Sequence, residues 1–226
     1  MRQALNGHSL IHAWRYLAVA GVVGLVISMS ASPASATIEN PPPDHIVVEV
    51  VTVNGSGCPA GTAAIAVAPD NTAFTITYSE YMAVVGLGST PTDFRKNCQI
   101  NVLVHVPQGF TFAVAKADYR GFASLANGAK AMQKANYYFQ GNSQTEFRTH
   151  RLNGPWDDNW QATDETEIPA LVFRPCGEQR LLNINTELRV DKGTSDTKKT
   201  TSLIAMDSTD GSINTIYHFH WKRCNN

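Results

Sequence analysis

Alternation of apolar and polar residues with a period of two is the feature of this sequence that most limits its fold. The pattern recurs in residues 74–78, 100–106, 182–190 and 213–221. Successive side chains of a β-strand point to opposite faces, so the pattern predicts strands with one face in a core. The residues on the predicted inner faces are Phe74, Ile76, Tyr78, Ile100, Val102, Val104, Val106, Leu182, Ile184, Thr186, Leu188, Val190, Ile213, Thr215, Tyr217, Phe219 and Trp221.

Turn signals separate these segments. Asn127-Gly128 and Asp210-Gly211 supply the positive φ angles of a tight hairpin. Residues 129–135 are an exception, because their Ala, Lys, Met and Gln residues suit a helix, and a short helical turn is an alternative there. The strand-like runs do not alternate with long helical patterns. The predicted fold class is therefore all-β, an antiparallel β-sandwich.

The first residues have the order of a secretory signal peptide. Arg2 and Arg15 precede an apolar run over residues 16–29, and small residues follow up to Ala36. The run is shorter than the roughly 20 residues that span a bilayer, and no later stretch is long enough. We predict a signal peptide over residues 1–36, a Pro-rich leader over 37–45, one β-sandwich domain over 46–226, and a secreted protein without a membrane span.

All four cysteines follow the predicted signal peptide, so they meet oxidising conditions and disulfides are expected. Four cysteines allow three connectivities, and the sequence does not choose among them. We favour Cys58 with Cys98 and Cys176 with Cys224. Closing each of these loops contributes about 4 kcal/mol in the chain-entropy account.

Charge and motifs exclude several classes of protein. Residues 1–36 hold two of the 18 basic residues and no acidic residue, which leaves 16 basic and 19 acidic residues in the mature chain. A chain with a net charge of −3 and no dense basic run is not expected to bind nucleic acid. It contains no G-x-S-x-G elbow, phosphate-binding loop or H-E-x-x-H motif. We therefore predict no cofactor and lean against an enzyme.

The segment Trp156-Asp157-Asp158-Asn159-Trp160 is the candidate ligand-binding site, and it is expected to be a loop because it follows Asn153-Gly154-Pro155. Indoles flanked by Asp and Asn can stack on sugar rings and bind their hydroxyls. Paired carboxylates can instead hydrolyse a glycosidic bond. In a purely structural alternative, Trp156 and Trp160 close one end of the core while the carboxylates face water.

His218-Phe219-His220 is the most metal-like feature, because residues two apart on a strand share a face. Two imidazoles supply only half of a tetrahedral site. No metal site is predicted, and His218 and His220 are kept as its candidate residues.

Several stretches resemble an exported family called domain of unknown function 4360. They include Gly55-Ser56-Gly57-Cys58-Pro59-Ala60-Gly61-Thr62, Pro69-Asp70-Asn71-Thr72-Ala73-Phe74, Phe94-Arg95-Lys96-Asn97-Cys98, Val106-Pro107-Gln108-Gly109-Phe110, Tyr119-Arg120-Gly121, Tyr137-Tyr138-Phe139-Gln140-Gly141, Cys176-Gly177-Glu178, Asn183-Ile184-Asn185 and Trp221-Lys222-Arg223-Cys224. The resemblance covers about residues 46–224. It implies a small secreted β-rich domain of bacteria and fungi with bridged cysteines, and it implies no activity, ligand or catalytic residue.

The sequence thus favours a non-catalytic extracellular or cell-surface binding module, whose candidate partners are an extracellular polysaccharide and a cell-surface component. The alternatives are a secreted hydrolase that uses the carboxylates near Trp156 and a structural protein of the envelope. The sequence carries no prediction of the oligomeric state.

Overall fold

The computed structural model describes residues 39–143, 147–206 and 214–224. The regular structure in these ranges consists of β-strands and a single 3₁₀ turn at Ile168–Ala170, which confirms the predicted all-β class. None of the helical structure described there is long and apolar enough to cross a membrane. The predicted signal peptide and the predicted Asp210-Gly211 turn lie outside the described residues, and the domain boundaries stay predictions.

One sheet has five antiparallel strands in the order β1-β5-β10-β7-β8. Its strands are β1 (Val47–Asn54), β5 (Arg95–His105), β7 (Lys130–Phe139), β8 (Arg148–Asn153) and β10 (Leu182–Asp191). The central strand β10 pairs with β5 along one edge and with β7 along the other.

The other sheet has seven antiparallel strands in the order β2-β3-β12-β6-β11-β4, with β9 paired to β6. Its strands are β2 (Ala63–Val67), β3 (Ala73–Tyr78), β4 (Met82–Gly86), β6 (Phe110–Leu125), β9 (Trp156–Glu165), β11 (Thr201–Ala205) and β12 (Thr215–Arg223). Strands β12 and β11 pair with successive parts of β6, and β9 pairs with the opposite edge of β6.

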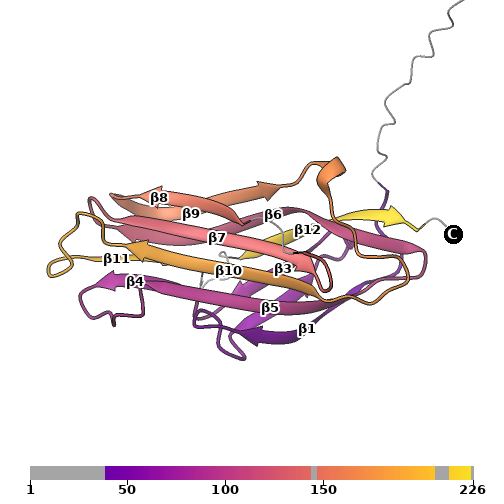
Figure 1. The fold of residues 1–226 in the computed structure, drawn as a ribbon, viewed down its shortest axis with the longest axis horizontal. Coiled ribbons are helices and arrows are strands. Elements are labelled where there is room, and N and C mark those ends of the chain that lie inside the picture. Colours follow the sequence, from indigo (N-terminus) through magenta and orange to yellow (C-terminus); the bar gives the residue numbers. More distant parts are fainter. Residues whose placement is uncertain (1–38, 144–146, 207–213, 225–226) are drawn as a thin grey trace, which may run out of the picture. The chain divides into compact units, whose positions relative to one another are not determined.

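The two sheets stack as a sandwich, and the chain crosses between them from β6 to β7 and again from β8 to β9 (Figure 1). The predicted tight turn at Asn127-Gly128 is present, with Gly128 at φ +83° and the amide of Ala129 bonded to the carbonyl of Ala126 at 3.0 Å. The predicted hairpin is wrong, because β6 and β7 belong to different sheets. The dipeptide determines the local backbone, whereas strands distant in sequence determine the pairing.

The core lies between the sheets and contains the predicted inner faces. All of the predicted inward residues that the structure describes are buried except Val106, which follows the end of β5 and is half-buried. Aromatic rings form much of this interior, since Phe112 of β6 meets Phe139 of β7 and Phe219 of β12 edge-on, with ring centroids 5.2 and 5.1 Å apart. Such aromatic pairs stabilise the fold by more than the burial of their apolar area alone.

Residues 129–135 are not helical, and most of them belong to β7. Strand β7 forms hydrogen bonds with β10 on one edge and β8 on the other, and its inward residues Ala131, Gln133 and Ala135 are buried. Helix propensity differs by less than about 1 kcal/mol per residue among such residues, so pairing on both edges outweighs it. The predicted helical alternative is therefore wrong.

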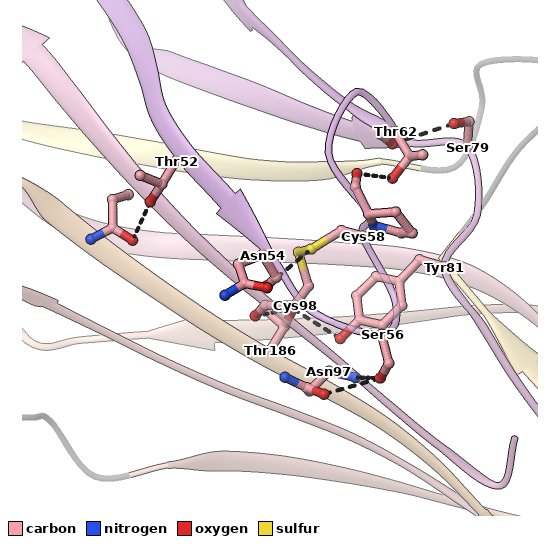
Figure 2. Close-up of a disulfide and its surroundings, with 12 residues drawn as sticks. Thr52, Asn54, Ser56, Cys58, Thr62, Ser79, Tyr81, Asn97, Cys98 and Thr186 are labelled. Carbon is pink, nitrogen blue, oxygen red and sulfur yellow. Dashed lines mark hydrogen bonds between the residues drawn. A yellow bond between two sulfur atoms is a disulfide. The ribbon is translucent and has the colours of Figure 1, made fainter. Parts of the chain in front are cut away.

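Both predicted disulfides are present, Cys58–Cys98 and Cys176–Cys224, and no described cysteine is free. The first bridge joins the β1–β2 connection to the inner face of β5, beside the buried hydrogen bond from the Tyr81 hydroxyl to the Thr186 hydroxyl at 3.0 Å (Figure 2). Gly57 packs closely against the Tyr81 ring, and a Cβ atom at this position would lie 2.2 Å from a ring carbon.

Asn71 fastens the proline-rich leader to the sandwich. Its side-chain amide donates to the carbonyls of Pro42 and Asp44 at 3.0 and 2.8 Å, and its side-chain oxygen accepts from the amide of Ile46 at 3.1 Å. The Asn71 carbonyl accepts from the Trp221 indole at 2.8 Å. The predicted leader is thus held against the domain at its last residues.

Candidate functional site

The segment with two tryptophans is strand β9, so the predicted loop is wrong. It pairs with β6 along its whole length, from Trp156 opposite Leu125 to Glu165 opposite Lys116. A segment so rich in carboxylates can be a strand because it occupies a sheet edge. Charged side chains at such an edge also oppose pairing with another chain.

The two indoles have different surroundings. Trp160 is 5% exposed and covers Gly121 directly opposite on β6, where a Cβ would lie 2.5 Å from the indole. Trp156 is 37% exposed, and its indole N–H donates to the carbonyl of Asp158 at 3.0 Å. Trp160 is therefore part of the core, and Trp156 is the indole that a ligand can reach.

The carboxylates of this segment do not gather. Asp157 and Asp158 are exposed, but consecutive residues of a strand point to opposite faces. Asp164 is buried, with one carboxylate oxygen 2.8 Å from Nε2 of His150 on β8. A hydrolytic pair across a cleft lined by both indoles is therefore not formed by these side chains.

His218 and His220 both point outward from β12, as predicted, but they have separate partners. His218 Nε2 lies 2.8 Å from a carboxylate oxygen of Asp118, whereas the His220 ring packs against Phe173 at 5.8 Å between centroids. Burial lowers the pKa of His220. In the described ranges, no three His, Cys, Asp or Glu side chains gather as a metal site would require.

Asp118 is the centre of a small polar cluster on the outer face of the seven-stranded sheet. Lys116 lies 3.1 Å from one of its oxygens, and the Thr163 hydroxyl donates to the other at 2.6 Å. Burial alone would raise the pKa of Asp118, but the hydrogen bonds from Thr163, Lys116 and His218 together lower it. These three partners engage both carboxylate oxygens and come from β6, β9 and β12, so the cluster links the three strands.

The outer face of the five-stranded sheet carries a row of side-chain amides. The Thr52 hydroxyl donates to Asn101 at 3.0 Å, Asn101 donates to Asn183 at 2.7 Å, and Asn183 donates to the carbonyl of Tyr138 at 3.3 Å. Figure 2 shows the first of these bonds at Thr52. The row crosses four strands, because these residues are register partners on β1, β5, β10 and β7.

A second row lies on the same face, two residues away along each strand. Gln99 is opposite Asn185 on β10, and Asn185 is opposite Asn136 on β7, to which it donates at 3.1 Å. Gln99 is exposed, and its side chain makes no hydrogen bond to a described residue. We call the residues of both rows the amide face: Thr52, Gln99, Asn101, Asn136, Asn183 and Asn185.

Apart from Gln99, the side chains of the amide face are held by hydrogen bonds before any ligand arrives. Each amide oxygen accepts up to two hydrogen bonds and each NH₂ donates two, so Asn101 keeps one donor and one acceptor site after its bonds within the row. Bonds along the row hold the side chains in single orientations, which lowers the entropy cost of binding.

Sequence reasoning missed this surface, although a signal for it was present. Asn101, Asn183 and Asn185 alternate with core residues, so their position on an outer face followed from the pattern. That these amides are neighbours depends on the pairing of β5 with β10, which joins residues about 80 positions apart in the chain.

The fold and site define an antiparallel β-sandwich, linked by two disulfides, with a hydrogen-bonded polar face on one sheet. The chain belongs to the family described as Domain of unknown function (DUF4360), which it matches over residues 44–224. It is 36% identical over 186 residues to an "Uncharacterized secreted protein" of Arthroderma benhamiae, covering 82% of this chain and 75% of the relative. The secreted relative and the disulfides confirm the predicted location outside the cell.

Two solved structures show weak similarity. The enzymatically active domain of bacteriophage CBA120 tailspike protein 4 aligns with 76% of this chain and 19% of its own, at 10% identity and a TM-score of 0.26. TmCBM61 in complex with β-1,4-galactotriose aligns with 79% of this chain and 88% of its own, at 11% identity and a TM-score of 0.24. At these scores neither similarity supports a conclusion about function.

Proposed function

We propose that the protein is a secreted, non-catalytic module that binds an extracellular polysaccharide on the amide face. The observation that carries this proposal is the hydrogen-bonded row from Thr52 through Asn101 to Asn183. Adjacent hydroxyls of a sugar ring require a donor and an acceptor close together, and a planar amide offers both. A flat row of amides offers this pair repeatedly, as a polymer of similar units requires.

The amides that carry the proposal differ in how exposed they are and in whether neighbouring side chains hold them. Gln99 is exposed between Asn54 and Asn185 on the neighbouring strands, and its side chain is available to a ligand. Asn183 is 8% exposed and mainly holds Asn101 in position. We therefore assign ligand contact to Gln99 and Asn101, and positioning to Asn183.

Trp156 gives a second contact surface to be tested, since its indole is exposed at the edge strand β9. Trp160 is not a useful probe of binding, because its replacement would leave a cavity in the core.

The test is retention of the mature protein on a panel of insoluble polysaccharides, followed by titration calorimetry with soluble fragments of any polymer that binds. Removing one hydrogen bond at Gln99 is expected to weaken binding by about 2- to 10-fold, and Gln99→Ala combined with Asn101→Ala by more. Gln161→Ala is the matched control, because Gln161 is an exposed glutamine on a strand of the other sheet.

Loss of retention in the Gln99 and Asn101 variants, with Gln161→Ala unchanged, supports the amide face. Loss only in Trp156→Ala would move the site to β9 and refute the amide face. Absence of retention on every polymer would refute polysaccharide binding altogether.

A further inference from the structure

Three cations surround a pocket at one end of the five-stranded sheet, on the same outer face as the amides. The pocket has a volume of about 180 Å³, and its charged lining residues are Lys130, Arg151, Arg189 and Asp191. They come from β7, β8 and β10, which lie side by side (Figure 1). The remaining lining residues include Met132 and Asn153.

Strand register explains why the cations converge. Arg189 is opposite Met132, and Met132 is opposite Arg151, so the two arginines flank one methionine in a single cross-strand row. Neighbouring strands are about 4.8 Å apart, which separates the two backbones by roughly 10 Å. Because their side chains lie on the same face, Arg151 and Arg189 can contact a single bound group above Met132, each from its own side. Lys130 lies in the next outward row, two residues before Met132 on β7.

The positive charges that line this pocket outnumber the carboxylates that line it. Lys130, Arg151 and Arg189 form no ion pair with a described residue, whereas Arg95, in the same row, is bound to Glu187 at 2.7 Å. Glu187 also attracts Arg189, but more weakly than an ion pair would. Asp191 is the pocket's own carboxylate, and one of its oxygens accepts the amide of Gly193 at 2.8 Å. Three cations and one carboxylate leave an excess of two positive charges.

Such an arrangement opposes stability, because like charges brought together on one sheet face repel each other. The mature chain carries more acidic than basic residues, so general basicity does not explain the cluster. An anionic group bound in the pocket would satisfy the donors. Arginine suits this role because its planar guanidinium can bind a carboxylate with two parallel hydrogen bonds.

A second, larger cavity shares two lining residues with this pocket. Arg189 and Asp191 also line a cavity of about 400 Å³, together with Lys192 and Phe94. The Arg189 guanidinium lies over the Phe94 ring at 5.4 Å, which orients it at the boundary between the two cavities. A chain-like ligand that occupied both cavities would therefore pass beside the same arginine.

We propose that this pocket binds the carboxylate of an acidic polysaccharide, so that the polymer held by the protein is built from uronic acids. The inference rests on the proposed function, since the pocket lies on the sheet face that carries the amides, and it names the class of polymer. Arg151 and Arg189 hold the carboxylate from two sides, and Lys130 adds a third positive charge.

The experiment compares two polymers with one backbone, polygalacturonate and its fully methyl-esterified form, by calorimetry on the mature, oxidised protein. We expect at least tenfold tighter binding to polygalacturonate, and a preference that shrinks as salt rises. Arg151→Met and Arg189→Met are each expected to lower affinity for polygalacturonate about tenfold and to leave affinity for the ester unchanged. Arg120→Met is the matched control, because Arg120 is an exposed arginine on the outer face of the other sheet.

Arg151→Lys separates the effect of charge from that of hydrogen-bond geometry, since lysine keeps the positive charge but cannot form the two parallel hydrogen bonds of a guanidinium. We expect it to retain part of the preference. Thermal unfolding of each variant shows whether it is folded, and Lys130→Met provides a further exposed position should one arginine variant fail to fold.

Equal affinity of the wild type for both polymers would overturn the acidic subsite and leave polysaccharide binding intact. A preference that survives Arg151→Met with Arg189→Met would also overturn it. Absence of binding to both polymers would overturn the inference, whereas the proposed function is decided separately by the neutral members of the panel.

Discussion

Asn71 gives the sharpest test of how the leader is held. Its side chain makes three hydrogen bonds, to Pro42, Asp44 and Ile46, in a site where Asn71 is 3% exposed. Its backbone has φ +58°, in the left-handed region that asparagine tolerates better than most residues. Replacing Asn71 therefore removes hydrogen bonds and, for most side chains, adds backbone strain.

The expected losses in the free energy of unfolding follow from the lost hydrogen bonds and from the backbone strain. At about 1 kcal/mol net for each hydrogen bond, Asn71→Gly should lower the free energy of unfolding by about 3 kcal/mol. Asn71→Ala loses the same bonds and adds about 1 kcal/mol, because alanine is strained at this φ. In a domain of this size, 3 kcal/mol corresponds to a fall in Tm of about 6 to 12 °C.

Asn71→Asp separates the contribution of the side-chain NH₂ group, which donates two hydrogen bonds, from that of the side-chain oxygen, which accepts one. It keeps an oxygen for the amide of Ile46 but turns a carboxylate oxygen toward the carbonyls of Pro42 and Asp44, which both need a donor. We expect a loss at least as large as that of Asn71→Gly at neutral pH.

The assay is urea and thermal unfolding of the protein without the predicted signal peptide and with its disulfides intact, together with limited proteolysis of the predicted leader. Asn159→Ala, an exposed asparagine on β9, is the control and should stay within about 0.5 kcal/mol of the wild type. An Asn71→Gly variant with wild-type stability would refute the reasoning, as would an Asn71→Ala variant more stable than Asn71→Gly.

Two further predictions concern the core and the pH dependence. Trp160→Ala should cost about 3 to 5 kcal/mol because the buried indole leaves a cavity beside Gly121, whereas Trp156→Ala should cost less than about 1 kcal/mol; comparable losses in denaturant titrations would contradict the different burial of the two indoles. The Lys96 ammonium 2.9 Å away, with hydrogen bonds from Thr90, lowers the pKa of Asp93 from 3.8 to about 2. A carboxyl with a depressed pKa stabilises the folded state above its ordinary pKa and loses that contribution as the pH falls from about 4 to about 2, so the wild type should lose its stability advantage over Asp93→Asn in that range. A difference in unfolding free energy that does not change between these pH values would show that Asp93 has an ordinary pKa.

The acidic tryptophan segment shows where local reasoning reaches its limit. Its composition and the preceding Gly154-Pro155 favoured a loop, yet β6 extends far enough to pair with all of it. Burial then divided two indoles that look equivalent in the sequence, because Trp160 is opposite a glycine and Trp156 is opposite Leu125. Neither neighbour can be known before the strand pairing is known.

The sequence by itself determined the all-β class, the inward faces of the main strands and the expectation that the four cysteines form disulfides, whereas the structure decided which of the three connectivities is formed. The first properties depend on the period of two along each strand and on the number of cysteines, which are local or countable. Only the tertiary structure decided that β6 and β7 lie in different sheets, that Asn71 holds the leader, and that amides and arginines distant in the chain become neighbours. Contacts across a sheet depend on the register between strands that are often far apart in the chain, and a pattern within one strand does not encode which strand will be its partner.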